Sequence, residues 1–163
     1  MDQHFLASPE KIAVMLAALA PEPGDRVMEL GAGRGTVAAH LPSCRELTLV
    51  DLDPVLCTIL RGKFAARGGT FVRCADALAV LRTHPTDRIL SNLPWFLTRE
   101  VLETLRGVSF TSAVVTVRAG EDLSAFADDF VLTPVAELEE ADFCPPQPFR
   151  SQVWRLTRRT PAP

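Results

Sequence analysis

The chain alternates between short apolar runs and stretches with helical spacing, a pattern that few folds accommodate. The apolar runs that indicate strands occupy residues 27–30, 47–50, 71–74, 89–91 and 113–117. Strands that alternate with helices join through right-handed crossovers into a parallel sheet with helices on both faces. We therefore predict an α/β fold with a mostly parallel sheet, and such sheets bind ligands at the carboxyl ends of their strands.

Two helices are predicted by a capping residue followed directly by proline, because proline suits the first helical position. The first begins at Ser8-Pro9 and the second at Asp53-Pro54. We expect a further helix from about Thr36, directly after a glycine-rich stretch.

The pattern changes after residue 117. Residues 131–139 and 153–156 are predicted to form a closing antiparallel hairpin. The length suits one core, and no repeat or low-complexity segment occurs. We therefore predict a single domain over residues 1–163, with a disordered tail at residues 160–163.

Charge and cysteine content weigh against several classes of protein. The chain has 17 basic and 20 acidic residues, and this net charge of −3 disfavours nucleic-acid binding through bulk charge. The longest apolar run, residues 12–20, is too short for a membrane helix. The spacing of the four cysteines is not that of a zinc site, so no bound metal is expected. We expect them to be reduced, mostly buried thiols of a cytoplasmic protein: Cys44, Cys57, Cys74 and Cys144.

A glycine-rich turn follows the first predicted strand. Residues 29–35 read E-L-G-A-G-R-G, with glycines at Gly31, Gly33 and Gly35. Glycines allow a tight turn and let a ligand approach the backbone closely. The spacing lacks the third glycine of the dinucleotide fingerprint, which favours a smaller adenosine ligand over a pyrophosphate.

Two acids follow the next two strands. Asp51 is placed to accept the ribose hydroxyls of such a ligand. Asp76 is placed to accept an adenine amino group, and Leu52 and Ala77 offer apolar contacts to the ring. Ordinary loop chemistry is the alternative interpretation of these residues.

Residues 91–96 follow the fourth predicted strand and contain Asn92, the only asparagine of the chain. Methyl transfer to a planar amine requires its nitrogen to be held in line with the methyl carbon. The Asn92 side-chain oxygen and the Leu93 carbonyl can accept two N–H bonds, since Pro94 restricts Leu93 to extended geometry. Trp95 can stack on a base. A plain Asn-x-Pro turn with a core tryptophan is the alternative.

The motifs, in this order, resemble those of the ribosomal RNA adenine dimethyltransferases, which comprise the KsgA and Erm enzymes. The matching segments are residues 3–6 (Q-H-F-L), 29–35, 50–53 (V-D-L-D), 75–78 (A-D-A-L), 92–95 (N-L-P-W) and 143–151 (F-C-P-P-Q-P-F-R-S). The resemblance implies a Rossmann-like class I methyltransferase fold, S-adenosylmethionine as cofactor, and methylation of the adenine amine in RNA.

The resemblance also implies roles for individual residues. Cofactor-binding residues would be Gln3, His4, Leu6, Glu29, Gly31, Gly33, Gly35, Asp51, Leu52, Asp76, Ala77 and Asn92. Catalytic residues would be Asn92, Leu93, Pro94 and Trp95, and Trp95 and Phe143 would bind substrate.

The chain departs from the family pattern in four ways. Trp95 replaces the usual Tyr or Phe, and no basic arm precedes Gln3. The sequence ends where the helical C-terminal domain of the family would begin. Residues 119–143 hold eight acids and no base, which should repel phosphates. Four arginines follow, which either touch a phosphate backbone or form a solvated tail: Arg150, Arg155, Arg158 and Arg159.

We therefore expect an S-adenosylmethionine-dependent N-methyltransferase whose substrate is the adenine amine in RNA, with rRNA as the expected RNA. We also consider a protein partner in place of the family's helical C-terminal domain, which would carry a large part of the RNA-docking surface. One alternative is an N-methyltransferase of a small-molecule or lipid amine, which the short, acidic chain suits. Another is a catalytically silent protein that binds cofactor or a partner. No membrane association is expected.

Overall fold

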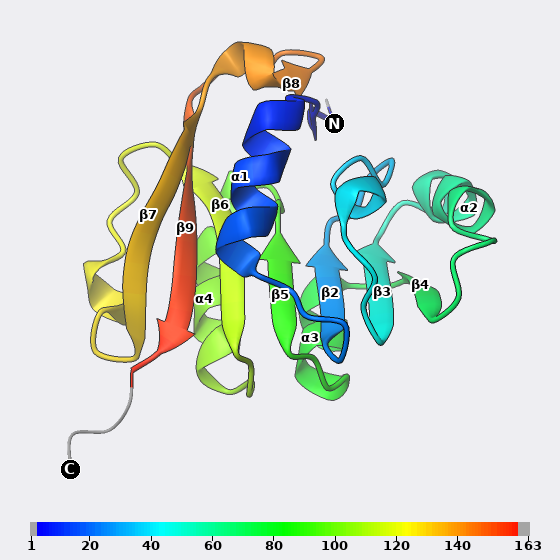
Figure 1. Cartoon of the computed structure of the whole chain (residues 1–163). Helices are drawn as coiled ribbons and strands as arrows, with labels where there is room; N and C mark the ends of the chain where they lie inside the picture. The colour runs from blue at the N-terminus through cyan, green and yellow to red at the C-terminus, as the bar shows by residue number, and fades with distance from the viewer. Residues whose placement is uncertain (1–2, 160–163) are drawn as a thin grey trace.

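A seven-stranded sheet forms the centre of the protein, seen in a computed structural model that describes residues 3–159 (Figure 1). The tail predicted at residues 160–163 lies outside the described residues. In spatial order the strands are β4 (Thr70–Cys74), β3 (Glu46–Asp51), β2 (Arg26–Leu30), β5 (Arg88–Ser91), β6 (Ser112–Arg118), β9 (Ser151–Arg158) and β7 (Phe130–Leu138).

The first five strands of this order are parallel, and β9 joins β6 and β7 antiparallel. The mostly parallel sheet and the closing hairpin are thus confirmed. Each of the five predicted apolar runs forms a strand. Four of them are buried between two layers, whereas β4, at the edge of the sheet, is partly exposed.

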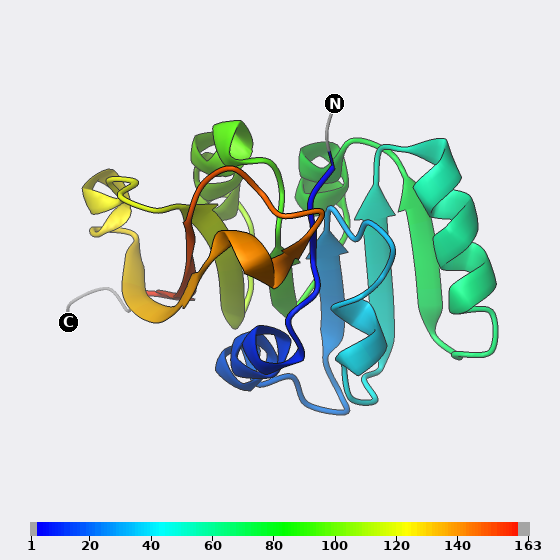
Figure 2. The same cartoon turned by 90° about the horizontal axis from the view of Figure 1, so that it is seen from above.

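Helices cover both faces of the sheet, as Figure 2 shows from above. Their bounds are α1 (Pro9–Leu19), α2 (Pro54–Lys63), α3 (Ala77–Thr83) and α4 (Thr98–Arg106). Helix α1 packs its apolar side against one face, whereas α3 and α4 pack against the other. The caps of α1 and α2 are Ser8 and Asp53, as predicted. None of the helices within the described residues is long and apolar enough to cross a membrane.

The helix predicted from Thr36 is wrong. The chain instead makes turns and one short 3-10 helix, η1 (Ala38–His40). Gly35 has a φ of 70°, which is outside helical geometry. Pro42 then holds Leu41 in an extended conformation, so too few residues remain between these two points for an α-helix.

Two short strands that the sequence did not indicate lie across the top of the sheet in Figure 1. Strands β1 (Phe5–Leu6) and β8 (Phe143–Cys144) pair antiparallel. Together they form a strap, residues 3–7 with 143–145, which brings the N-terminal segment to the carboxyl ends of the parallel strands. The remaining 3-10 helices are η2 (Trp95–Leu97), η3 (Ser124–Phe126) and η4 (Glu140–Asp142).

A buried arginine holds the opposite, amino-terminal edge of the sheet together. Arg88 is only 7% exposed, and its Nε donates to Asp25 Oδ2 at 2.7 Å. Its Nη1 donates to the Leu19 carbonyl and to Ser112 Oγ. The guanidinium therefore ties β5 to β6, to the end of α1 and to the turn before β2.

We predict that Asp25→Ala lowers the free energy of unfolding by about 3–5 kcal/mol, because it leaves the buried Arg88 charge without its nearest carboxylate. Urea denaturation of the variant and the wild type measures this change. Glu103→Ala is the control, since it removes an exposed ion pair with Arg106 and should leave the free energy of unfolding nearly unchanged. Equal losses in the two variants would contradict the role given to Arg88.

Candidate active site at the carboxyl edge of the sheet

The glycine-rich turn leaves β2 at the carboxyl edge, where its backbone is fixed from several sides. Gly31, Gly33 and Gly35 all have positive φ, between 55° and 72°. A Cβ on Gly31 would lie 2.9 Å from Leu93 Cδ2, and one on Gly33 would lie 2.7 Å from the Phe5 ring. Glycine is favoured at these positions, because the positive φ strains any other residue and a Cβ would displace the neighbouring side chains.

Lys63 supports the outer side of the same turn. Its Nζ donates to the carbonyls of Arg34 and Gly35, each at 3.0 Å. Lys63 ends α2, so this helix and the turn are joined directly. The sequence did not indicate this contact, because the two segments lie 28 residues apart.

Asp51, at the end of β3, reaches into the glycine turn. Its Oδ2 accepts the Gly33 amide at 2.8 Å, and its Oδ1 accepts the Asp53 amide at 2.9 Å. Its carboxylate is half-buried, and each oxygen keeps a lone pair for a further donor. Leu52, predicted to contact an adenine ring, is 72% exposed beside it.

Asp76 follows β4 and caps α3. Its Oδ1 accepts the Ala79 amide at 2.8 Å, while its side chain is exposed. The next residue, Ala77, is half-buried. The carboxylate thus has a structural role as a cap, and its second oxygen is accessible for the predicted contact.

The asparagine loop after β5 lies against the glycine turn. The Asn92 amide donates to the Leu30 carbonyl at 3.3 Å, and the Asn92 carbonyl oxygen lies 3.5 Å from the Cβ position of Gly31. Within residues 3–159 the Asn92 side chain has no hydrogen-bond partner. Pro94 leads into η2, where Trp95 is 45% exposed.

The strap holds the N-terminal residues that were predicted to bind cofactor. His4 Nδ1 is 3.0 Å from the Pro145 carbonyl, and Gln3 Nε2 donates to Asp53 Oδ2 at 3.4 Å. Figure 2 shows the N-terminal segment crossing the carboxyl edge above β2. Gln3 is exposed and His4 is half-buried, but Leu6 is only 2% exposed.

Phe143 does not face the surface, in contrast to its predicted contact with substrate. It is 4% exposed, and it packs in the core beside its strap partner Leu6. The β1–β8 pairing turns the ring inward. Nearby, the Gln147 Nε2 donates to the buried Ser151 Oγ at 2.8 Å.

Most of the arginines after residue 143 form ion pairs or hydrogen bonds within the fold. Arg150 binds Glu137 and Glu139 at 3.0 and 2.5 Å, which neutralises part of the acidic stretch. Arg158 donates to three carbonyls at the end of α4, and Arg159 donates to the Ala127 carbonyl. These three arginines are thus held by the fold, and Arg155 is half-buried on β9, so they do not form the solvated tail that was one of the two interpretations.

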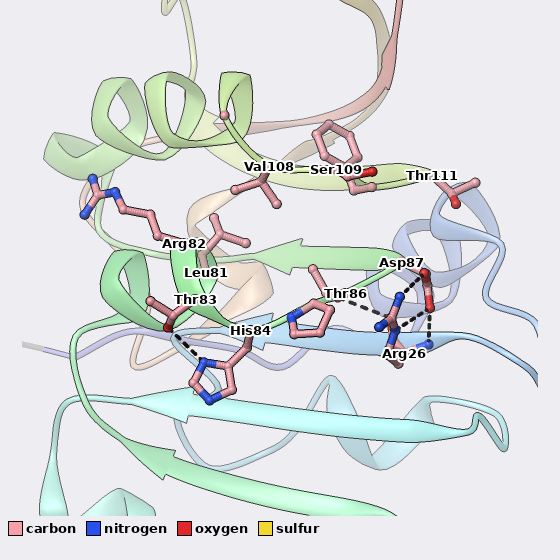
Figure 3. A pocket seen from close by; sticks show the side chains of 13 residues that line it. Arg26, Leu81, Arg82, Thr83, His84, Thr86, Asp87, Val108, Ser109 and Thr111 are labelled. Carbon is pink, nitrogen blue, oxygen red and sulfur yellow. Dashed lines mark hydrogen bonds and ion pairs between the residues drawn. The ribbon is translucent and has the colours of Figure 1, made fainter.

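A hollow of about 340 Å³ lies at the opposite edge of the sheet (Figure 3). Arg26 and Asp87 pair on one side of it, and this hydrogen bond lowers the pKa of Asp87. Thr83 and His84 lie on the other side. None of the predicted site residues lines this hollow, so it is separate from the site at the carboxyl edge.

The cysteines are less buried than predicted. Only Cys57 is fully buried, Cys44 is half-buried, and Cys74 and Cys144 are exposed. Burial raises the pKa of Cys57 to about 12, which keeps this thiol protonated. Within the described residues no group of three or more His, Cys, Asp or Glu side chains could hold a metal ion.

Glu29 lies under the glycine turn. It is 3% exposed, and its Oε2 has no hydrogen-bond partner within the described residues. Burial raises its pKa to about 8, whereas a backbone hydrogen bond from Ala38 and the positive charge of Lys63 act in the opposite direction. It therefore supports the turn from within, and it has little surface for the direct cofactor contact that was predicted.

Comparison with known proteins identifies the family to which this chain belongs. The model of the family described as "Ribosomal RNA adenine dimethylase" matches residues 1–83. A protein of Rubrobacter xylanophilus, ribosomal RNA small subunit methyltransferase A, is 30% identical over an alignment that covers 100% of this chain and 70% of that protein. The chain belongs to the ribosomal RNA adenine dimethylase family.

Other relatives of the dimethylase family differ from this chain in length. A probable ribosomal RNA small subunit methyltransferase A of Methanosarcina barkeri is 35% identical over 61% of this chain, which spans only 35% of that protein. The crystal structure of the 23S rRNA methyltransferase ErmE superposes with a TM-score of 0.85 at 22% identity, covering 96% of this chain and 70% of that chain. The Rossmann-like methyltransferase fold is thereby confirmed.

We predict that Glu29→Gln changes how the stability of this dimethylase-family chain depends on pH. Folded Glu29 holds its proton more tightly than the unfolded chain does. Its contribution to stability is therefore present below pH 4.5 and is lost as pH rises to about 8. Above that pH the wild type should be less stable than Glu29→Gln by roughly a few kcal/mol.

Chemical denaturation at a series of pH values from 4 to 9 would measure this difference, with the exposed Glu121→Gln as the control. A difference between wild type and Glu29→Gln that stays constant across this range would contradict the assignment.

Proposed function

We propose that this protein is an S-adenosylmethionine-dependent N-methyltransferase that acts on the exocyclic amine of adenine in RNA. The observation that carries the proposal is the contact between the glycine turn and the asparagine loop, with the Asn92 carbonyl 3.5 Å from the Cβ position of Gly31. A group bound at the turn would therefore lie beside the amide that is suited to hold an amine. Family membership supports the same activity.

The residues at the carboxyl edge fit this cofactor. The glycine turn offers a backbone surface without side chains at Gly31, Gly33 and Gly35. Asp51 has unused acceptor positions for two ribose hydroxyls, and the free oxygen of Asp76 can accept an adenine amino group. Leu52 is exposed for an apolar contact with the ring. When bound, S-adenosylmethionine supplies the methyl group that is transferred.

Asn92 would position the target amine. Its side-chain oxygen can accept one N–H bond and the Leu93 carbonyl a second, which directs the nitrogen lone pair toward the cofactor side of the loop. The absence of any partner for the Asn92 side chain within residues 3–159 leaves it available for this role. The nitrogen needs no strong general base, since the methylated ammonium releases its extra proton readily to water.

Trp95 would bind the base next to Asn92. It is 45% exposed at the start of η2, so part of its indole is accessible to a planar ligand. Stacking of a base on an aromatic side chain contributes about 1–3 kcal/mol. The acidic stretch near this edge is partly neutralised by Arg150, which reduces its repulsion of a nucleic acid.

We predict that Asn92→Ala abolishes methyl transfer but leaves cofactor affinity within about twofold of wild type. The variant removes the acceptor for the amine and keeps the glycine turn and Asp51 intact. Transfer of labelled methyl from S-adenosylmethionine to total RNA measures turnover, and equilibrium dialysis measures cofactor binding. Thr83→Ala, which truncates a polar side chain in the hollow at the opposite edge, is the control.

Unchanged turnover by Asn92→Ala would contradict the role of this residue. Label found on small-molecule extracts and not on RNA would favour an amine substrate of another class. Cofactor binding by the wild type without transfer to any acceptor would indicate a catalytically silent protein.

A further inference from the structure

Arg118 is the last residue of β6 and emerges at the carboxyl edge beside the asparagine loop. Strand β6 pairs with β5 on one side and with β9 on the other, where Arg118 stands opposite Ser151. The side chain is exposed. It therefore stands between the loop that carries Trp95 and the connection from β8 to β9.

Two aromatic rings hold the Arg118 guanidinium. Its Cζ lies 5.2 Å from the centre of the Trp95 ring and 5.4 Å from the centre of the Phe149 ring. The two rings come from segments 54 residues apart in sequence that meet only in the folded chain. Cation–π contacts of this kind fix the position of a guanidinium with little need for a carboxylate.

The donors of Arg118 are not used by the described part of the chain. Its guanidinium makes no hydrogen bond or ion pair within residues 3–159. Arg106, Arg150 and Arg158 differ, because carboxylates or carbonyls take up their donors. A guanidinium that lies against a ring keeps its N–H groups in its own plane, where they match the oxygens of a phosphate.

Neighbouring acids do not occupy this guanidinium. Glu121 and Asp122 follow closely in sequence and are exposed, yet neither forms an ion pair with Arg118. Asp122 Oδ1 instead accepts the Ser124 amide at 2.9 Å. The negative charge of these acids weakens the non-specific electrostatic attraction of RNA to this edge. A direct contact between Arg118 and one phosphate would therefore contribute a larger share of the binding energy.

We propose that Arg118 binds a backbone phosphate of the RNA strand, next to the nucleotide whose base lies against Trp95. This inference rests on the proposed function, because it takes the base position from that proposal. A base on Trp95 places its own sugar and phosphate beside the ring. Arg118 is the cation that contacts this ring.

The test measures binding of a short fluorescent single-stranded RNA containing adenosine, by anisotropy over a range of salt concentrations with S-adenosylhomocysteine present. Arg118→Gln should weaken binding about tenfold to a hundredfold at low salt, the loss typical of a hydrogen bond to a charged group. It should also reduce the slope of log affinity against log salt by about 0.7, the value for one phosphate on a single strand.

Two further variants serve as controls. The first tests whether the positive charge at position 118 is enough, and the second tests whether a loss of net charge elsewhere has the same effect. Arg118→Lys keeps the charge and should restore the salt slope, with only part of the affinity. Arg82→Gln makes the same change in net charge at the opposite edge, where Arg82 lines the hollow, and should leave both quantities unchanged. Circular dichroism of each variant checks its folding.

An unchanged salt slope in Arg118→Gln would overturn the proposal, even with reduced affinity, because the residue would then act only by holding Trp95. An equal effect of Arg82→Gln would also overturn it. A wild type that binds no RNA would overturn the phosphate contact and the RNA substrate together, and labelled methyl transfer to free adenosine would then show whether the methyltransferase activity itself stands.

Discussion

The hydrogen bond from the Gly33 amide to Asp51 joins two neighbouring strand ends, and the site is arranged around it. It requires the turn to pass close to β3, which a φ of 55° at Gly33 allows. The same conformation leaves room for the Phe5 ring of the strap, and Leu93 of the asparagine loop closes on Gly31. The glycine turn, the end of β3, the strap and the asparagine loop therefore all depend on the backbone conformation of this one turn.

The sequence predicted the features of the fold that depend on short, local residue patterns. The five parallel strands, the caps of α1 and α2 and the closing hairpin all follow from apolar runs, capping residues and turn signals a few residues long. The strand ends then bring Asp51, Asp76 and Asn92 to one edge by topology alone. The helix expected from Thr36 failed because Gly35 and Pro42 leave too short a segment between them.

Contacts between distant segments could not be predicted in this way. The inward turn of Phe143 follows from its pairing with Leu6, 137 residues earlier in the chain. The engagement of Arg150 by Glu137 and Glu139 depends on the register of the hairpin. Arg118 carries no motif, and its two aromatic neighbours come together only when the sheet is complete.

The two edges of the sheet have different tasks. At the amino-terminal edge, Arg88 donates its hydrogen bonds to other residues of the chain and joins the beginnings of the strands. At the carboxyl edge, polar groups such as the Asn92 side chain and Arg118 make no hydrogen bond or ion pair within residues 3–159. The amino-terminal edge is thus joined by internal hydrogen bonds, whereas the carboxyl edge has donors and acceptors that the described residues do not use.

Calorimetric titration of the protein with S-adenosylmethionine tests the central claim most directly. The account predicts binding of one cofactor per chain. It also predicts that Asp51→Ala weakens binding by about 1–3 kcal/mol, since two ribose hydroxyls lose their acceptor. Asp122→Ala, an exposed acid outside the glycine turn, should bind as the wild type does. No binding by the wild type, or equal affinity in Asp51→Ala, would contradict the account.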